Sequence, residues 1–332
     1  MKIYTPEYYQ QFSCIASACP DSCCKEWEVD VDEIAAAFYR SLDGALGDRL
    51  RNVLKDTDSG TVMTIEDGRC PMWRQDGLCR IQAELGHDAL CQVCQDFPRL
   101  RHDYGDFVEY GLELSCPEAA RLILSQSHTF TVSESDGGDT PEYDAEIMEI
   151  LKSSRKTVLE FLDTTTLPAN LALAVLLFYS HEVQNWIDGG EAAILDVDSC
   201  LLLAKKHATN GDWELLFRFF RELEILTPQW NNRLCAPMTA SHWHASFFAL
   251  IRYFIGRYWL QAVSDYDLVC RVKFLITASL IICRLGGDFI ETAQSFSKEI
   301  ENDLDNLERI LDGAYNAPAL TDIQLLSLLL DC

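Results

Sequence analysis

Apolar residues recur at helical spacing through most of the second half of the chain. Repeats of three to four residues place side chains on one face of a helix. This spacing predicts helices over residues 143–162, 171–187, 213–226, 247–263, 268–285, 289–311 and 323–330. Residues that end helices fall between these segments, namely Pro168, Gly189, Pro228, Pro237, Gly286 and Pro318. Residues 142–332 are therefore predicted to form an α-helical bundle.

The first 130 residues show a weaker pattern. Short amphipathic helices are predicted over residues 31–42, 46–55 and 79–91, and short strands over residues 61–65 and 107–114. The polar segment 131–141 is rich in turn-forming residues and is expected to be a linker. The sequence thus predicts a mainly α protein, with a cysteine-rich metal-binding module containing little strand in residues 1–130, followed by the helical domain in residues 142–332.

The composition is that of a folded and strongly acidic protein. Of 332 residues 48% are hydrophobic, and 52 acidic residues face 27 Lys and Arg, a formal net charge of −25. No basic patch is visible, which argues against partners such as nucleic acid or an anionic membrane surface. A solvated acidic surface explains the charge most simply, and attraction to a basic, lysine-bearing protein is the more specific interpretation.

No targeting or membrane segment is visible in the sequence. The N-terminus lacks the apolar core of a signal peptide. The most apolar stretches are interrupted by Arg252, Arg257, Lys273 and Arg284, so none reaches the ~20 apolar residues that span a bilayer. We expect a cytoplasmic protein, in which cysteines are better interpreted as metal ligands or buried thiols than as disulfides.

Nine of the fourteen cysteines lie at or before position 116. They are Cys14, Cys19, Cys23, Cys24, Cys70, Cys79, Cys91, Cys94 and Cys116. Cys91 and Cys94 have the two-residue separation that turns both sulfurs onto one ion. Cys19 and Cys23 would face the same way on a helical turn, whereas the adjacent Cys23 and Cys24 are expected to point apart.

The nine cysteines predict thiolate-bound metal. Cys116 precedes Pro117 at a predicted helix start, where the helix dipole favours a thiolate. Buried thiols acting as small hydrophobic residues are the alternative, most readily for Cys24 or Cys91. Thiolate ligands suit zinc and iron–sulfur clusters about equally, so two zinc sites, or one cluster and one zinc, both fit.

Motifs around these cysteines resemble the flagellin lysine N-methylase family, a group within a broader set of zinc- or iron-chelating domains. The resemblance covers about residues 8–125. It is carried by Phe12-Ser13-Cys14, Cys19-Pro20-Asp21-Ser22-Cys23-Cys24 with Trp27, Cys70-Pro71-Met72, Gly77-Leu78-Cys79-Arg80-Ile81, Leu90 to Cys94, Phe97-Pro98-Arg99, and Cys116-Pro117-Glu118-Ala119-Ala120-Arg121.

The resemblance implies a function and a cofactor. It implies transfer of a methyl group from S-adenosylmethionine to lysine side chains of flagellin, with an iron–sulfur cluster (4Fe-4S) as cofactor. The implied ligands are Cys14, Cys19, Cys23, Cys24, Cys70, Cys79, Cys94 and Cys116, while Cys91 is not a firm part of the family pattern. Within the motifs, Asp21 and Arg99 are expected either to hydrogen-bond ligand sulfurs or to form surface ion pairs.

Residues that would bind the methyl donor are not identified by any motif. There is no glycine-rich turn between a strand and a helix, and Gly286-Gly287 is better interpreted as a helix stop. His242 and His244 flank Trp243 and are expected to serve packing. A non-catalytic zinc or iron–sulfur module for protein interaction or redox sensing therefore stands as the alternative function.

Overall fold

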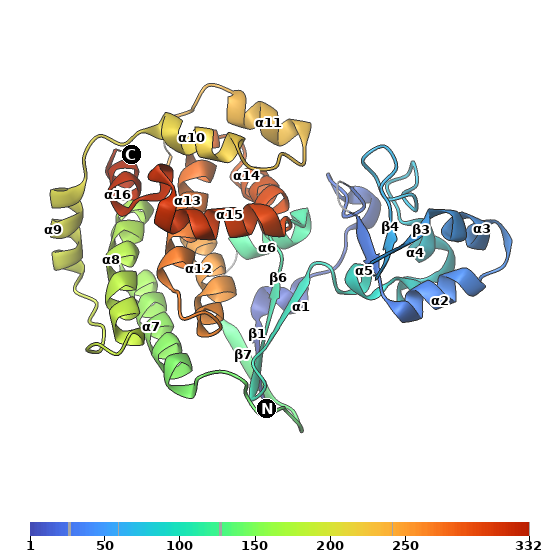
Figure 1. The fold of residues 1–332 in the computed structure, drawn as a ribbon, viewed down its shortest axis with the longest axis horizontal. Helices are drawn as coiled ribbons and strands as arrows, with labels where there is room; N and C mark the ends of the chain where they lie inside the picture. Colours follow the sequence, from blue (N-terminus) through green and yellow to red (C-terminus); the bar gives the residue numbers. More distant parts are fainter. Residues whose placement is uncertain (26–27, 59, 126–127, 241, 332) are drawn as a thin grey trace.

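The fold was analysed in a computed structural model, in which residues 1–25, 28–58, 60–125, 128–240 and 242–331 are described. Two hydrophobic cores divide these residues. One joins residues between Val29 and Cys91, and the other joins Tyr8 and Phe12 with residues from Phe107 to Leu329. Figure 1 shows the corresponding bodies, a small lobe and a larger helical assembly. We call residues 14–97 the cysteine lobe and the remainder the bundle body.

The cysteine lobe is built from a small sheet and short helices. Its sheet has the order β2-β4-β3, with both pairs antiparallel. Its elements are η1 (Ala16–Ala18), β2 (Val29–Val31), α2 (Glu33–Ser41), α3 (Gly44–Val53), β3 (Leu54–Thr57), β4 (Gly60–Met63), α4 (Arg80–Leu85), η2 (His87–Ala89) and α5 (Gln92–Asp96). Asp32 caps α2 by accepting from the Ala35 N–H. Tyr39, Leu50 and Met72 are fully buried at its centre.

A second sheet connects the chain's N-terminus to the bundle body. Its order is β5-β6-β1-β7, with β1 parallel to β6 and antiparallel to β7. Its strands and the helices beside it are β1 (Lys2–Pro6), α1 (Glu7–Gln11), β5 (Arg99–Asp103), β6 (Phe107–Leu112), α6 (Pro117–Ser125) and β7 (Phe130–Glu134). The expected linker at 131–141 is therefore wrong in its first part, because residues 131–134 pair with β1.

The helices of the bundle body surround one that is buried on all sides. They are α7 (Ala145–Thr164), α8 (Ala169–Ile187), α9 (Val197–His207), α10 (Trp213–Arg221), α11 (Pro228–Cys235), α12 (Ser246–Tyr258), η3 (Trp259–Val263), α13 (Val269–Leu285), α14 (Phe289–Phe296), the π-helical η4 (Ser297–Glu301), α15 (Leu304–Asn316), η5 (Pro318–Leu320) and α16 (Asp322–Leu330). Residues Val269 to Cys283 are all buried, so α13 forms the centre (Figure 1). None of the described helices is long and apolar enough to cross a membrane.

The predicted mainly α fold with a helical bundle is confirmed. Asp212 caps α10, and Gly286 ends α13 with a φ of 65°, where a helix stop was expected. The predicted helix 289–311 is divided into α14, η4 and α15, and the sequence pattern missed α9 and α11. The described residues also contain seven short strands, all before residue 135. The division of the chain into two domains, residues 1–130 and 142–332, stays a prediction.

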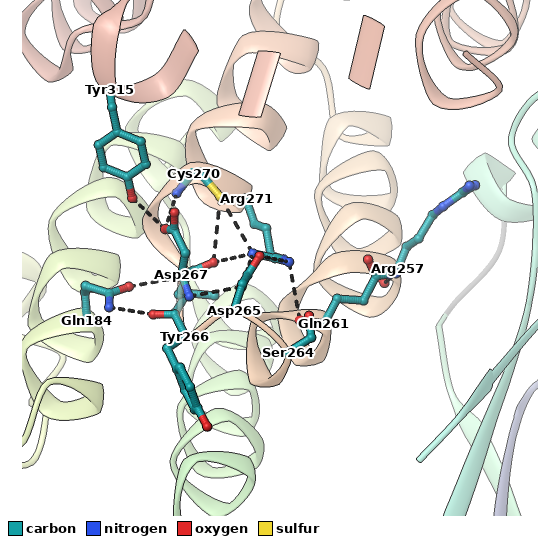
Figure 2. Close-up of polar contacts among 11 residues, drawn as sticks. Gln184, Arg257, Gln261, Ser264, Asp265, Tyr266, Asp267, Cys270, Arg271 and Tyr315 are labelled. Carbon is teal, nitrogen blue, oxygen red and sulfur yellow. Dashed lines mark hydrogen bonds and ion pairs between the residues drawn. The ribbon is translucent and has the colours of Figure 1, made fainter. Parts of the chain in front are cut away.

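Polar side chains fix the turn that leads into α13 (Figure 2). Asp267 accepts from the Cys270 N–H at 3.1 Å and from the Tyr315 hydroxyl at 2.6 Å. Gln184 holds the same turn through its side-chain amide, which bonds Tyr266 O and the Leu268 N–H. Tyr266 itself adopts a φ of 60°, a conformation rare for residues other than glycine. These contacts join α8, α13 and α15, and this structural role accounts for the polar residues of the cluster.

Candidate metal centre

Six of the nine predicted ligand cysteines line one small cavity in the cysteine lobe. The cavity measures about 60 Å³ and is otherwise walled by apolar side chains such as Val29, Met63 and Leu90. The six are Cys23, Cys24, Cys70, Cys79, Cys91 and Cys94. Cys79 precedes α4 and Cys91 precedes α5, so both sulfurs are presented at helix starts. The fold thus gathers thiols from positions 71 residues apart.

Hydrogen bonds among these thiols raise the pKa of some and lower the pKa of others. Cys24 lies within hydrogen-bonding reach of Cys23, Cys70 and Cys79, and these contacts raise its pKa. The same contacts lower the pKa values of the three partners, that of Cys79 to about 6 despite its burial. Thiols with lowered pKa values ionise more readily, and the thiolate is the form that binds a metal.

Cys91 and Cys94 form a second such pair within the cavity. The hydrogen bond between them lowers the pKa of Cys91 and raises that of Cys94. Cys23 and Cys79 also act electrostatically on Cys94, so the pair lies close to the other four sulfurs. Cys91, the member outside the firm family pattern, is buried and faces the same cavity as the rest.

The remaining three predicted ligands are grouped around Cys19. Cys14 and Cys23 both act electrostatically on Cys19, and Cys19 and Cys23 both act on Cys116. Cys14 is exposed, and its sulfur accepts from the Ala16 N–H at 3.4 Å. Cys23 thus interacts both with thiols of the small cavity and with Cys19 and Cys116.

The expected thiolate at Cys116 is not favoured by the fold alone. Helix α6 begins at Pro117 as predicted, and the N–H groups of Glu118 and Ala119 do bond the sulfur. Burial is the larger effect, however, and raises the pKa of Cys116 to about 11. The helix start therefore acts in the expected direction but does not by itself ionise this thiol, and a thiolate at Cys116 stays a prediction.

Two residues of the bundle body, neither predicted from the sequence, contact the cysteine segments. The Gln294 side-chain amide donates to Ser115 O at 2.7 Å and to the Asp21 carboxylate at 3.3 Å. Lys298 pairs with Asp21 at 2.9 Å, and Lys25 pairs with it at 3.1 Å. Burial acts to raise the pKa of Asp21, but Lys298 and the other donors outweigh it and lower the pKa.

The donor set fits a thiolate-bound metal in type and convergence. Thiolates with apolar surroundings suit zinc or an iron–sulfur cluster. Even so, within the described ranges no group of three or more Cys, His, Asp or Glu side chains is already positioned to hold an ion. The metal-binding character of the module and its ligands therefore remain a proposal.

The other residues singled out in the sequence serve packing. Arg99 lies over the Phe12 ring at 5.1 Å, and His244 packs edge-on against Phe247 and Phe289. The His242 N–H donates to the Cys283 sulfur at 3.2 Å. Cys200, Cys270 and Cys283 are buried, whereas Cys235 is exposed. Trp27 and Cys332 lie outside the described residues.

Comparison with known proteins supports the resemblance seen in the motifs. Over 136 residues, 39% of this chain, it is 35% identical to the flagellar biosynthetic protein FliU of Salmonella muenchen, of which it covers 80%. It is 36% and 35% identical over 136 residues to proteins named lysine-N-methylase from Salmonella choleraesuis (strain SC-B67) and Salmonella typhimurium (strain LT2). This chain belongs to the flagellin lysine N-methylase family. It spans about a third of the length of the two lysine-N-methylases, 34% of each.

Membership in the family rests on sequence, because no protein-family model and no solved structure matches this chain. The similarity covers 39% of the chain, and the rest lies outside the matched region. The contacts of Asp21 and Ser115 with Gln294 show how residues far downstream nevertheless hold the cysteine motifs in place.

Proposed function

We propose that this chain is a protein lysine N-methyltransferase that acts on flagellin or a similar protein and depends on a thiolate-bound metal. The observation that carries the proposal is the identity of 35–36% with proteins named lysine-N-methylase. Methyl transfer breaks the bond between the donor sulfonium and its methyl carbon, forms a bond from that carbon to the lysine nitrogen, and releases one proton. The acidic protein surface, with a net charge of −25, would attract a lysine-rich substrate.

The residues that would hold the metal are the nine cysteines, and an iron–sulfur cluster or zinc would be the bound group. Such a group would fix the lobe and, as a cluster, would also offer redox chemistry. Cys24 is central to the small cavity because three other thiols contact it. Asp21, held by Lys25 and Lys298, would keep Cys19 and Cys23 oriented, since it lies between them in the chain.

The test combines methylation with metal analysis on the full chain purified without oxygen. Flagellin incubated with S-adenosylmethionine should gain mass in methyl increments. Cys24→Ser should lose metal and activity, while Cys200→Ser, a buried cysteine of the bundle body, should retain both. A metal-loaded protein that neither binds the donor nor modifies flagellin would contradict the proposal and favour the interaction or redox-sensing module.

A further inference from the structure

A large cavity lies where the cysteine segments meet the bundle body. It measures about 670 Å³, within the roughly 300–1,000 Å³ typical of sites for small ligands. Ile15, Pro20 and Pro117 line it, and these are the chain neighbours of Cys14, Cys19 and Cys116. Further lining comes from α11 and α14, through residues that include Arg233, Ile290 and Ser295. The cavity therefore exists only when both parts are folded together.

The walls of this cavity carry charges of both signs. Asp21 pairs with Lys25 and Lys298, as described above. Arg233 pairs with Glu291 at 2.5 Å and donates to the Thr292 hydroxyl at 2.8 Å. Pro20, Pro117 and Ile290 contribute apolar surface to the same lining. Such a wall suits a ligand that is itself zwitterionic and has a substantial apolar body.

We propose that this cavity binds the methyl donor, S-adenosylmethionine. The inference rests on the proposed methyltransferase function and locates its donor site. The donor carries a carboxylate, an ammonium and a sulfonium on a nucleoside, so it presents both signs of charge together with flat apolar surface. Arg233 would recognise the carboxylate, with the neighbouring carboxylates facing the cationic groups. The donor would then lie beside Cys14, Cys19 and Cys116, at the edge of the candidate metal centre.

A second cavity in the bundle body supplies the matched control. It measures about 300 Å³ and is lined by residues that include His102, Arg155 and Gly256. None of its lining residues is a chain neighbour of the nine cysteines. A side chain placed at Gly256 would meet no atom within 4 Å of its Cβ, so Gly256→Leu would fill this cavity without a clash at the Cβ.

The experiment measures donor binding by calorimetry on the metal-loaded full chain. Ser295→Phe should fill the large cavity and Arg233→Met should remove its guanidinium, and each should weaken S-adenosylmethionine binding by about tenfold or more. Gly256→Leu should change the affinity less than about twofold. Decarboxylated S-adenosylmethionine should bind the wild-type chain more weakly, and Arg233→Met should reduce that difference. Circular dichroism and metal content would verify that each variant is folded and loaded.

The outcomes separate this inference from the proposed function. A wild-type chain that binds the donor and methylates flagellin, with unchanged affinity in Ser295→Phe and Arg233→Met, would overturn the donor site alone. Loss of binding in Gly256→Leu instead would also overturn it and assign the donor to the smaller cavity. A metal-loaded wild-type chain that does not bind the donor, with or without flagellin, would overturn both.

Discussion

The cysteine lobe and the bundle body differ in the size of their hydrophobic cores. The bundle body buries a continuous apolar core around α13, in which residues such as Phe254, Phe274 and Leu280 are at most 1% exposed. The lobe has short helices, a three-stranded sheet and a much smaller core around Tyr39, Leu50 and Met72. A small core contributes less net stability than a large one. Hydrophobic burial is extensive in the bundle body and limited in the lobe, so the proposed metal would contribute most to the lobe.

Metal removal should distinguish the two regions most strongly. If the cysteines hold a metal, chelation should unfold the lobe, because structural thiolate sites contribute about 10–16 kcal/mol to folding. Hydrogen exchange followed by mass spectrometry should show loss of protection in α2 to α5, while α8 and α13 keep theirs. Protection of the lobe that is unchanged after complete metal removal would show that its small core is sufficient.

Truncating one buried leucine in each region should produce a smaller difference between the two regions than metal removal does. Leu50 and Leu280 are both 0% exposed, and either change to Ala should cost about 2–5 kcal/mol. In the metal-loaded protein Leu50→Ala should strongly reduce the protection of the lobe, since little other core compensates. Leu280→Ala should lower the urea midpoint of the bundle and leave it folded. Equal and small losses in both regions would contradict the distinction between them.

Removing an ion pair within the bundle body should have the smallest effect on stability, and that effect should depend on pH. Asp322 at the start of α16 contacts Lys273 of α13 at 2.7 Å and His181 of α8 at 2.9 Å. Burial acts to raise the pKa of Asp322, but hydrogen bonds from these two residues outweigh it and lower the pKa to about 2. A lowered pKa means that the carboxylate stabilises the fold above its ordinary pKa of 3.8, an effect lost as the pH falls through about 2.

The corresponding variant is Asp322→Asn, with the exposed Asp312→Asn as control. Because the Asp322 side chain is 40% exposed, solvent screens its interactions, and the loss at pH 7 should be about 1 kcal/mol. Urea unfolding of the variant and the wild type should converge as the pH is lowered toward 2. A difference that is independent of pH would show that packing, and not charge, is the contribution of Asp322.

Local sequence patterns determined most helices and the presence of a cysteine module. The helical repeat identified α7, α8, α12, α13 and α16 because one face, or in α13 every face, is apolar. Short polar helices such as α11, and edge strands such as β7, were missed because their stability comes from contacts with distant segments. The spacing of cysteines likewise predicted a site but left open which sulfurs meet.

Only the tertiary structure decided how the cysteines are grouped and what surrounds them. It brought six of them to one small cavity and grouped Cys14 and Cys116 near Cys19. It also brought Gln294 to Asp21 across 273 residues and formed the large cavity beside them. These contacts join residues that are too far apart in the chain for any local pattern to predict. They form because packing of the whole chain fixes where each segment lies, which no segment determines alone.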